Sequence, residues 1–326
     1  MTARSTRLDW LLFLALGFMW GSSYLFIKIG VEEGGLRPFT LIALRLGIGF
    51  AVLAVVVALA REPLPREPRM YGHLLVMGVI NIVLPFFLIT WAEQSVESSL
   101  ASILNGTVPL FVIVIAALFL RDEPITVNRV VGLVVGFVGV VILTSRGLGA
   151  IGASNLGGEL ALIASAISYA AGNVYARRNV QGLRPMIPAV FQVGFALVIT
   201  TVLAFAFERP FELRLNEQAI FAVVWLGIFG SALAYLVYFR LLKRWGATRT
   251  SLVAYLLPVV GIVLGFLVLS EPVDGRLLVG TALVIGGVAL VNSRFGSRRL
   301  YGRAGAGGGI TPVEPAQRAN AASSDR

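Results

Sequence analysis

Ten long stretches of mainly apolar residues limit what this chain can fold into. Each approaches the roughly 20 residues that a helix needs to cross a bilayer, where backbone N–H and C=O groups must pair within the helix because lipid offers no partner. They cover about 10–30, 38–60, 72–92, 99–120, 126–145, 159–177, 188–207, 219–241, 248–269 and 275–292. Only 13 % of the residues are charged, against roughly 25 % in a soluble domain. The sequence therefore predicts an all-α membrane protein with ten transmembrane helices.

The distribution of basic residues predicts the orientation in the membrane. The net charge of +10 is compatible with nucleic-acid binding, so the positions of the 27 Lys and Arg residues have to decide. With a cytoplasmic N-terminus, 20 of them fall in cytoplasmic segments, six fall on the opposite side, and Arg45 lies within a span. The positive-inside rule then places both termini in the cytoplasm. We expect a multi-pass protein of the cell (inner) membrane that contacts lipid and a small-molecule substrate, and no nucleic acid.

The composition argues against a catalytic site. The chain has no cysteine and one histidine, which excludes disulfides, thiolate metal sites and cysteine nucleophiles. We expect all 17 acidic residues to lie outside the spans or at their ends. An acid–base pair, an activated nucleophile or a metal set therefore cannot be assembled near the midplane. We expect no enzyme activity, no cofactor and no metal.

The second half of the chain repeats the first. An offset of 149 places Trp20 on Tyr169 and Lys28 on Arg177, and the phrase PLFVIVIAALFLRDEP that starts at Pro109 returns as PVVGIVLGFLVLSEP from Pro258. We therefore divide the chain into a first five-helix repeat at 1–145, a Gly-rich linker at 146–158, a second repeat at 159–292 and a disordered cytoplasmic tail at 293–326. An odd number of helices in each half predicts that the two repeats have inverted orientations.

The repeated motifs resemble those of the EamA group of the drug/metabolite transporter superfamily. They are FMWGSSYLFIKIG in the first span, LRLG around Arg45, P…LFLRDEPIT at the end of the fourth span and VVGLVVGFVGVVIL in the fifth. The resemblance covers about residues 10–292. It implies a ten-helix inner-membrane carrier, commonly an exporter of amino acids or related metabolites. It also implies a central cavity between helices 1, 3, 4 and 6, 8, 9.

Two polar stripes are candidates for lining that cavity. Spacing by four residues places side chains on one face of a helix, and each stripe begins near the middle of its span. The stripes point toward opposite membrane surfaces and end in a cation. The alternatives are that the cations snorkel to the interface and that the aromatic side chains pack in the core. The stripes are Trp20, Tyr24 and Lys28 in the first half, and Tyr169, Asn173 and Arg177 in the second.

Mid-span prolines mark further candidate positions. A proline frees the carbonyl four residues earlier, and in lipid such a group must be buried in protein or face a wet cavity. Pro85, Pro109 and Pro258 are therefore predicted helix breaks. Packing between helices would use the neighbouring polar groups equally well. The side chains expected at the same depth are Asn81, Asn105, Ser231, Tyr235 and Tyr255.

The remaining charged candidates lie near the helix ends or within one span. An arginine inside the membrane is a functional-site hypothesis, but Arg45 could equally pair with Glu93, Glu97 or freed carbonyls. Glu123 and Glu271 each precede a proline and then a residue type that caps helices. We interpret this pair as turn-forming residues and as candidate gate contacts.

Glycines recur in the fifth and tenth spans and predict close helix contact. Helices with small residues every few positions can approach closely in lipid. Packing within one chain and packing across a dimer both explain the pattern, so the oligomeric state stays open. The residues are Gly132, Gly136, Gly139, Gly280, Gly286 and Gly287.

These features favour a secondary, non-ATP transporter that works by alternating access between two inverted repeats. Because no carboxylate is expected deep in a span, we expect a neutral or zwitterionic metabolite such as an amino acid, held without a fixed countercharge. We expect export, although neither the direction of flux nor proton coupling follows from the sequence. A receptor or structural protein is the alternative, and an intramembrane enzyme is favoured less.

Overall fold

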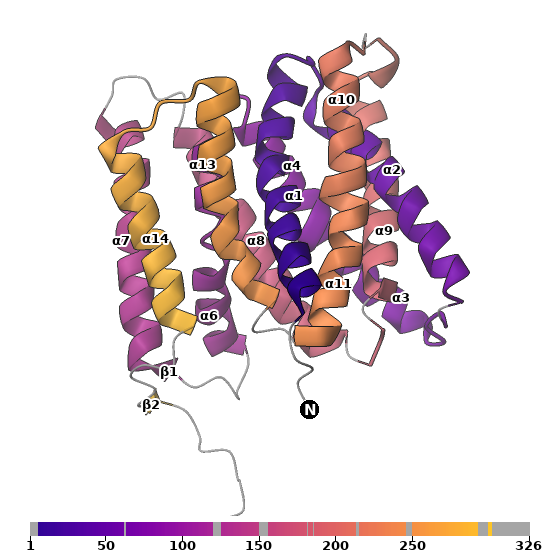
Figure 1. Ribbon diagram of the computed structural model, residues 1–326. Coiled ribbons are helices and arrows are strands. Elements are labelled where there is room, and N and C mark those ends of the chain that lie inside the picture. The colour runs from indigo at the N-terminus through magenta and orange to yellow at the C-terminus, as the bar shows by residue number, and fades with distance from the viewer. Residues whose placement is uncertain are drawn as a thin grey trace, which may run out of the picture.

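The computed structural model describes residues 6–61, 63–119, 125–149, 156–180, 182–184, 186–212, 215–245, 250–292 and 299–301, and it is nearly all helical (Figure 1). The long elements of the first half are α1 (Arg7–Glu32), α2 (Pro38–Leu59), α3 (Pro68–Gly78), α4 (Leu84–Ala92), α5 (Ser98–Asn105), α6 (Val108–Phe119) and α7 (Val127–Gly149). Those of the second half are α8 (Leu156–Asn179), α9 (Met186–Phe207), α10 (Glu217–Trp225), α11 (Ala234–Trp245), α13 (Leu256–Leu269) and α14 (Gly275–Asn292). Short segments are η1 (Val79–Val83), η2 (Pro210–Glu212), η3 (Leu226–Leu233), η4 (Ser251–Tyr255), β1 (Ile125–Thr126) and β2 (Arg299–Tyr301).

Within the described ranges, six helical segments are long and apolar enough to cross a membrane. They are Arg7–Glu32, Pro38–Leu59, Pro68–Ala92, Ser98–Phe119, Met186–Phe207 and Glu217–Tyr238. Three shorter apolar helices are Val127–Leu143, Val253–Leu269 and Gly275–Val291. The chain is therefore a multi-pass membrane protein. That all ten expected ranges cross the bilayer stays a prediction.

Several features expected from the sequence fall outside the described residues. Glu123 is one of these, as is most of the tail at 293–326. Helix α7 ends at Gly149 and α8 begins at Leu156, so helical structure enters the expected linker at 146–158 from both sides. Residues 299–301 of the tail form β2, which pairs antiparallel with β1.

Helices from the two halves of the chain intermix. α1 packs against α13, α10 and α11, and α8 packs against α4, α6 and α5. α2 likewise packs against α9 and η3. Figure 1 shows α1 standing between α13 on one side and α10 and α11 on the other. Any site at the centre is consequently built by side chains from both halves.

A π-helical segment precedes Pro85 and changes which carbonyl the proline leaves unpaired. In η1 the bonds run five residues back, since Leu84 N–H donates to the carbonyl of Val79. Pro85 follows and has no N–H, so the carbonyl it cannot pair is that of Ile80. The sequence rule placed the freed group one residue later, at Asn81, because it assumed an α-helical register. Ser168 Oγ of α8 donates to the Ile80 carbonyl at 2.6 Å, so the proline break is satisfied by a helix of the other half.

The other two predicted prolines also stand in the first turn after a break. Pro109 is the second residue of α6, which follows a gap after the end of α5 at Asn105. Pro258 is the third residue of α13, which continues from the 3₁₀ segment η4. A proline in the first turn costs little, because the N–H it lacks has no partner within the helix there.

The glycines of α7 and α14 bring these two helices into backbone contact. A Cβ built on Gly287 would lie 2.5 to 2.7 Å from backbone atoms of Gly136 and Gly132, and one on Gly139 would lie 2.8 Å from the carbonyl oxygen of Gly280. Gly286, by contrast, has open space where a Cβ would stand. Figure 1 shows α7 and α14 side by side at one edge of the bundle. Packing within one chain therefore accounts for most of the glycine pattern.

We predict that Gly287→Ala destabilises the protein and that its neighbour Gly286→Ala does not. The methyl group at position 287 collides with the backbone of α7, for which repacking costs about 1–3 kcal/mol. At position 286 the methyl group meets nothing, and alanine is the better helix former by about 1 kcal/mol. Thermal unfolding of the two variants in the same detergent measures the difference. Equal melting temperatures would show that α7 and α14 are not in backbone contact.

Candidate functional site

Seven of the predicted residues meet between the helices of the two halves, and we call them the central polar cluster. α1 supplies Trp20 and Tyr24, α2 supplies Arg45, α5 ends on Asn105, and α8 supplies Tyr169. Ser231 lies in η3 and Tyr235 in the first turn of α11. Helical spacing predicted the α1 pair, and tertiary packing brings the rest to it. The cluster comprises Trp20, Tyr24, Arg45, Asn105, Tyr169, Ser231 and Tyr235.

A hydrogen bond joins α1 and α5 at one side of the cluster, and a serine of α8 lies beside it. Asn105 Nδ2 donates to the hydroxyl oxygen of Tyr24 at 2.5 Å. Ser165 Oγ of α8 lies 3.4 Å from Asn105 Oδ1 and donates at 2.7 Å to the Leu162 carbonyl. Because the Tyr24 oxygen accepts this bond, the Tyr24 hydroxyl proton remains available for another acceptor. Asn105 thus orients Tyr24 as a donor.

Aromatic side chains form another part of the cluster. The ring of Trp20 meets Tyr235 edge-on at a centroid distance of 6.4 Å and lies 5.4 Å from Tyr238 at a tilt. Such pairs contribute about 0.5–1.5 kcal/mol beyond the area that they bury. Tyr169 lies within electrostatic range of Tyr24 and Tyr235. Trp20 and Tyr169, the first residues of the two predicted stripes, therefore belong to one cluster.

Arg45 is the charge inside the cluster. It is 3 % exposed, and its Nη2 donates to Ser231 Oγ at 3.4 Å. The guanidinium carbon lies 4.3 Å from the centroid of the Phe86 ring, a cation–π contact. Its Nε has no hydrogen-bond partner. Among the described residues Arg45 forms no ion pair, so the pairing with Glu93 or Glu97 that the sequence left open does not occur.

Four other predicted residues have different surroundings. Asn81 packs its amide over Gly172 of α8, where even a methyl group would collide with it. Asn173 and Arg177 are exposed, and their role in lining a cavity stays a prediction. Tyr255 packs with Leu110 and Val288 in a separate apolar cluster. The 3₁₀ geometry of η4 turns each residue further than an α-helix does, which rotates Tyr255 away from the centre.

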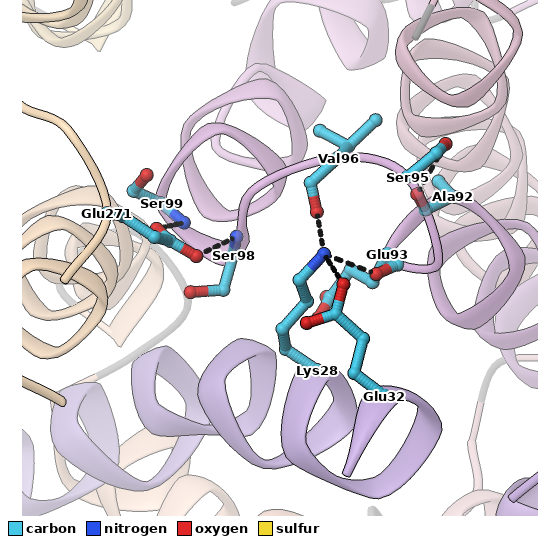
Figure 2. Close-up of polar contacts among 9 residues, drawn as sticks. All are labelled: Lys28, Glu32, Ala92, Glu93, Ser95, Val96, Ser98, Ser99 and Glu271. Carbon is cyan, nitrogen blue, oxygen red and sulfur yellow. Dashed lines mark hydrogen bonds and ion pairs between the residues drawn. The ribbon is translucent and has the colours of Figure 1, made fainter. Parts of the chain in front are cut away.

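Lys28 holds the end of α1 against the loop between α4 and α5. Its Nζ donates to the carbonyls of Glu93 at 2.8 Å and Val96 at 3.0 Å, and it pairs with Glu32 at 2.6 Å (Figure 2). The side chain is buried, so it does not snorkel to an interface. Its counterpart in the repeat, Arg177, is exposed. The two cations are therefore not equivalent in this conformation.

Glu271 caps a helix of the other half of the chain. Its two carboxylate oxygens accept bonds from Ser98 N at 2.6 Å and Ser99 N at 2.9 Å, at the start of α5 (Figure 2). The N-cap residue of α5 makes no side-chain cap of its own. A carboxylate is favoured there by both the free N–H groups and the helix dipole. Glu271 was expected beside its own turn, whereas Asp274 does cap the following helix through Leu277 N.

Glu208 makes the same kind of contact with α2. It accepts bonds from the Phe39 and Thr40 N–H groups at 2.9 and 2.7 Å and from the Thr40 hydroxyl. The N-cap of α2 also lacks a side-chain bond. Two carboxylates from the second half thus cap two helices of the first, at the same end of the bundle as Lys28.

Glu93 lies buried beneath these contacts. It is 0 % exposed, and neither carboxylate oxygen has a hydrogen-bond partner among the described residues. Burial raises its pKa well above the ordinary value, an effect that Lys28 opposes and Glu271 reinforces. Glu93 is therefore held in its neutral form over a wider pH range than an exposed glutamate.

Sequence reasoning missed several contacts that complete the site. The ring of Phe86 makes a cation–π contact with Arg45, Ser168 donates a hydrogen bond to the Ile80 carbonyl, and Glu208 caps α2. One signal was available: neither Arg37 nor Glu97 is a good N-cap residue, so α2 and α5 needed caps from elsewhere. The partner that supplies each cap depends on packing between the halves. No group of three or more potential metal ligands occurs within the part of the chain that the structure describes.

The comparisons place this architecture in a known family. The EamA-like transporter family model matches residues 9–145 and again residues 156–293. The chain therefore belongs to the EamA-like transporter family, a family of membrane transporters, which confirms the resemblance seen in the sequence motifs.

Relatives of similar length carry transporter names. The "Uncharacterized transporter YoaV" of Bacillus subtilis is 24 % identical over 287 residues, covering 88 % of this chain and 97 % of that protein. The "Uncharacterized inner membrane transporter YedA" of Escherichia coli is 29 % identical over 254 residues, covering 77 % and 79 %. A solved crystal structure aligns with a TM-score of 0.63 at 24 % identity, over 88 % of this chain and 96 % of that one. The last likeness concerns the fold alone.

We predict that Glu271→Gln lowers the melting temperature by several degrees. An amide presents one oxygen to two N–H groups and removes the charge, and losing charged hydrogen bonds costs about 1.5–3 kcal/mol. Glu217→Gln is the matched control, because Glu217 lies exposed in the first turn of α10 without capping another helix. If both variants melt at the same temperature, the cap from the second half contributes nothing to stability.

We also predict that Glu93 makes stability fall as pH rises. Its folded-state pKa exceeds its unfolded value, so above about pH 4.5 the unfolded chain releases the proton that the folded protein keeps. Glu93→Gln keeps the neutral form and should melt higher than wild type at neutral pH, with a flatter dependence on pH. Glu33→Gln, at an exposed position, is the control. A parallel pH dependence in wild type and Glu93→Gln would contradict the prediction.

Proposed function

We propose that this protein is a secondary transporter that exports small zwitterionic metabolites such as amino acids by alternating access. The observation that carries the proposal is the central polar cluster, which lies among apolar helices and draws its residues from both halves of the chain. A polar cluster in a membrane protein is expensive unless it is used or satisfied. Hydrogen-bond donors and aromatic rings bind a small molecule and supply no evident chemistry for converting it.

The inverted repeat is part of this proposal. The family model matches each half separately, and the irregular segments also repeat. The offset of 149 residues carries Val79 and Val83, the ends of η1, to Ile228 and Ala232, which both lie within η3. A shared π-helical segment at matching positions supports a common architecture for the halves. If each half contains five spans, the two halves have opposite orientations in the membrane.

The contacts at the end of α1 suggest how access would alternate. With both termini in the cytoplasm, this end is the outer one, and Lys28, Glu208 and Glu271 close it by joining helix ends across the bundle. Opening toward the outside would break these bonds. Short charged contacts suit such a role, since each can form in one state and exchange with water in the other.

Counterflow in proteoliposomes tests the proposal. The purified full-length chain is reconstituted with a panel of unlabelled α-amino acids inside, and uptake of the labelled compound is measured with and without a pH gradient. Saturable, trans-stimulated uptake is expected from a carrier. Binding without uptake would indicate a receptor, and chemical conversion of a solute would indicate an enzyme.

We predict that Trp20→Ala and Tyr169→Ala each impair transport at unchanged membrane expression. Both rings belong to the central polar cluster, and truncating either removes a wall of the site. Trp91→Ala is the control, because Trp91 lies exposed on α4 and makes no ring contact within the described residues. Initial counterflow rates normalised to the amount of protein provide the measurement. Wild-type rates in both cluster variants would refute the site assignment.

A further inference from the structure

Arg45 is a buried positive charge with few hydrogen-bond partners. A guanidinium has five N–H donors, and the one hydrogen bond that Arg45 makes among the described residues is the long contact to Ser231. Its Nε is buried without a partner. Burying a charge without a paired acceptor costs several kcal/mol. Phe86 offsets part of that cost and provides no hydrogen bond.

Three tyrosines lie near the guanidinium. Tyr24, Tyr169 and Tyr235 are among the groups within electrostatic range of Arg45. The Tyr24 oxygen accepts from Asn105, which leaves its proton available. Tyr169 makes no hydrogen bond within the described part of the chain. Helices α1, α2 and α8 therefore supply a positive charge and two hydroxyl groups with available protons within electrostatic range of one another.

Within the described residues, no acidic side chain pairs with Arg45. Glu93 lies within electrostatic range of Arg45, but it forms no bond with it, and burial keeps Glu93 neutral over a wider pH range. Glu271 and Glu208 are engaged by backbone N–H groups at the end of the bundle. Glu32 forms its ion pair with Lys28. Among the described residues, the Arg45 guanidinium therefore lies buried without a paired carboxylate.

We propose that Arg45 binds the carboxylate of the transported substrate, with the Tyr24 and Tyr169 hydroxyls as additional donors. A carboxylate fits the planar donor fork of arginine and accepts from hydroxyls at the same time. The inference rests on the proposed transport function. It changes the expected substrate class, because the site then contains a fixed countercharge. Compounds with a free carboxylate are bound, and uncharged or purely cationic analogues are rejected.

An analogue series on the wild-type protein tests the proposal without any mutation. Leucine, methionine and phenylalanine are each compared with the corresponding amide, the decarboxylated amine and the N-acetyl acid as inhibitors of counterflow. The parent compounds and the N-acetyl acids keep the carboxylate and should inhibit. The amides and amines lose it and should inhibit about 10- to 100-fold more weakly, the range expected for a charged hydrogen bond.

Substitution of Arg45 tests the same contact from the protein side. Arg45→Gln should remove the preference for the carboxylate, so that acids and amides inhibit equally, and Arg45→Lys should retain part of it because lysine keeps the charge without the fork. Arg37→Gln is the control, because Arg37 lies exposed at the start of the same helix. Tryptophan fluorescence of the detergent-solubilised protein, with Trp20 beside the site, reports binding independently of transport.

The outcomes separate this inference from the proposed function. If no parent compound shows counterflow, the transport proposal for this substrate class fails and the inference fails with it. If the parents are transported but their amides and amines inhibit equally well, transport stands and Arg45 is not the carboxylate site. If Arg45→Gln does not fold, the analogue series on wild type still decides between these results.

Discussion

Lipid offers the backbone no hydrogen-bond partner, and this constraint shapes the rest of the structure. Every point where a helix is interrupted has to be satisfied by another part of the protein. At Pro85 the π-helical register frees the Ile80 carbonyl, and Ser168 supplies the missing donor. At the starts of α2 and α5 the free N–H groups are satisfied by Glu208 and Glu271. In each case the partner comes from the other half of the chain.

The charged side chains occupy two different parts of the bundle. Lys28 and the two capping carboxylates gather at one end of the bundle, while Arg45 lies alone among tyrosines inside it. A buried ion pair satisfies its own charges, whereas a lone guanidinium with free donors nearby attracts an anion. The described polar groups thus include contacts that hold helices together and, at Arg45, a buried guanidinium with one long hydrogen bond.

Much of the fold could be predicted from the apolar stretches, the repeated prolines and the family-like motifs. The helix positions follow from these, and so do Trp20, Tyr24 and Asn105 as members of one site. The errors arose where the helical register changes: the freed carbonyl moved from Asn81 to Ile80, and Tyr255 turned away in a 3₁₀ segment. Regular spacing could not place them, because π and 3₁₀ turns alter the angle between successive residues.

The sequence by itself determined that the chain is a helical membrane protein, that helices break near Pro85, Pro109 and Pro258, and that Arg45 lies within a span. Composition and periodicity suffice for this, since crossing lipid restricts the backbone to a helix over each apolar stretch. Only the tertiary structure decided that Glu271 caps α5, that Ser168 satisfies the Ile80 carbonyl and that Arg45 has no acidic partner among the described residues. Those contacts join residues far apart in the chain, and their geometry depends on how helices of the two halves pack.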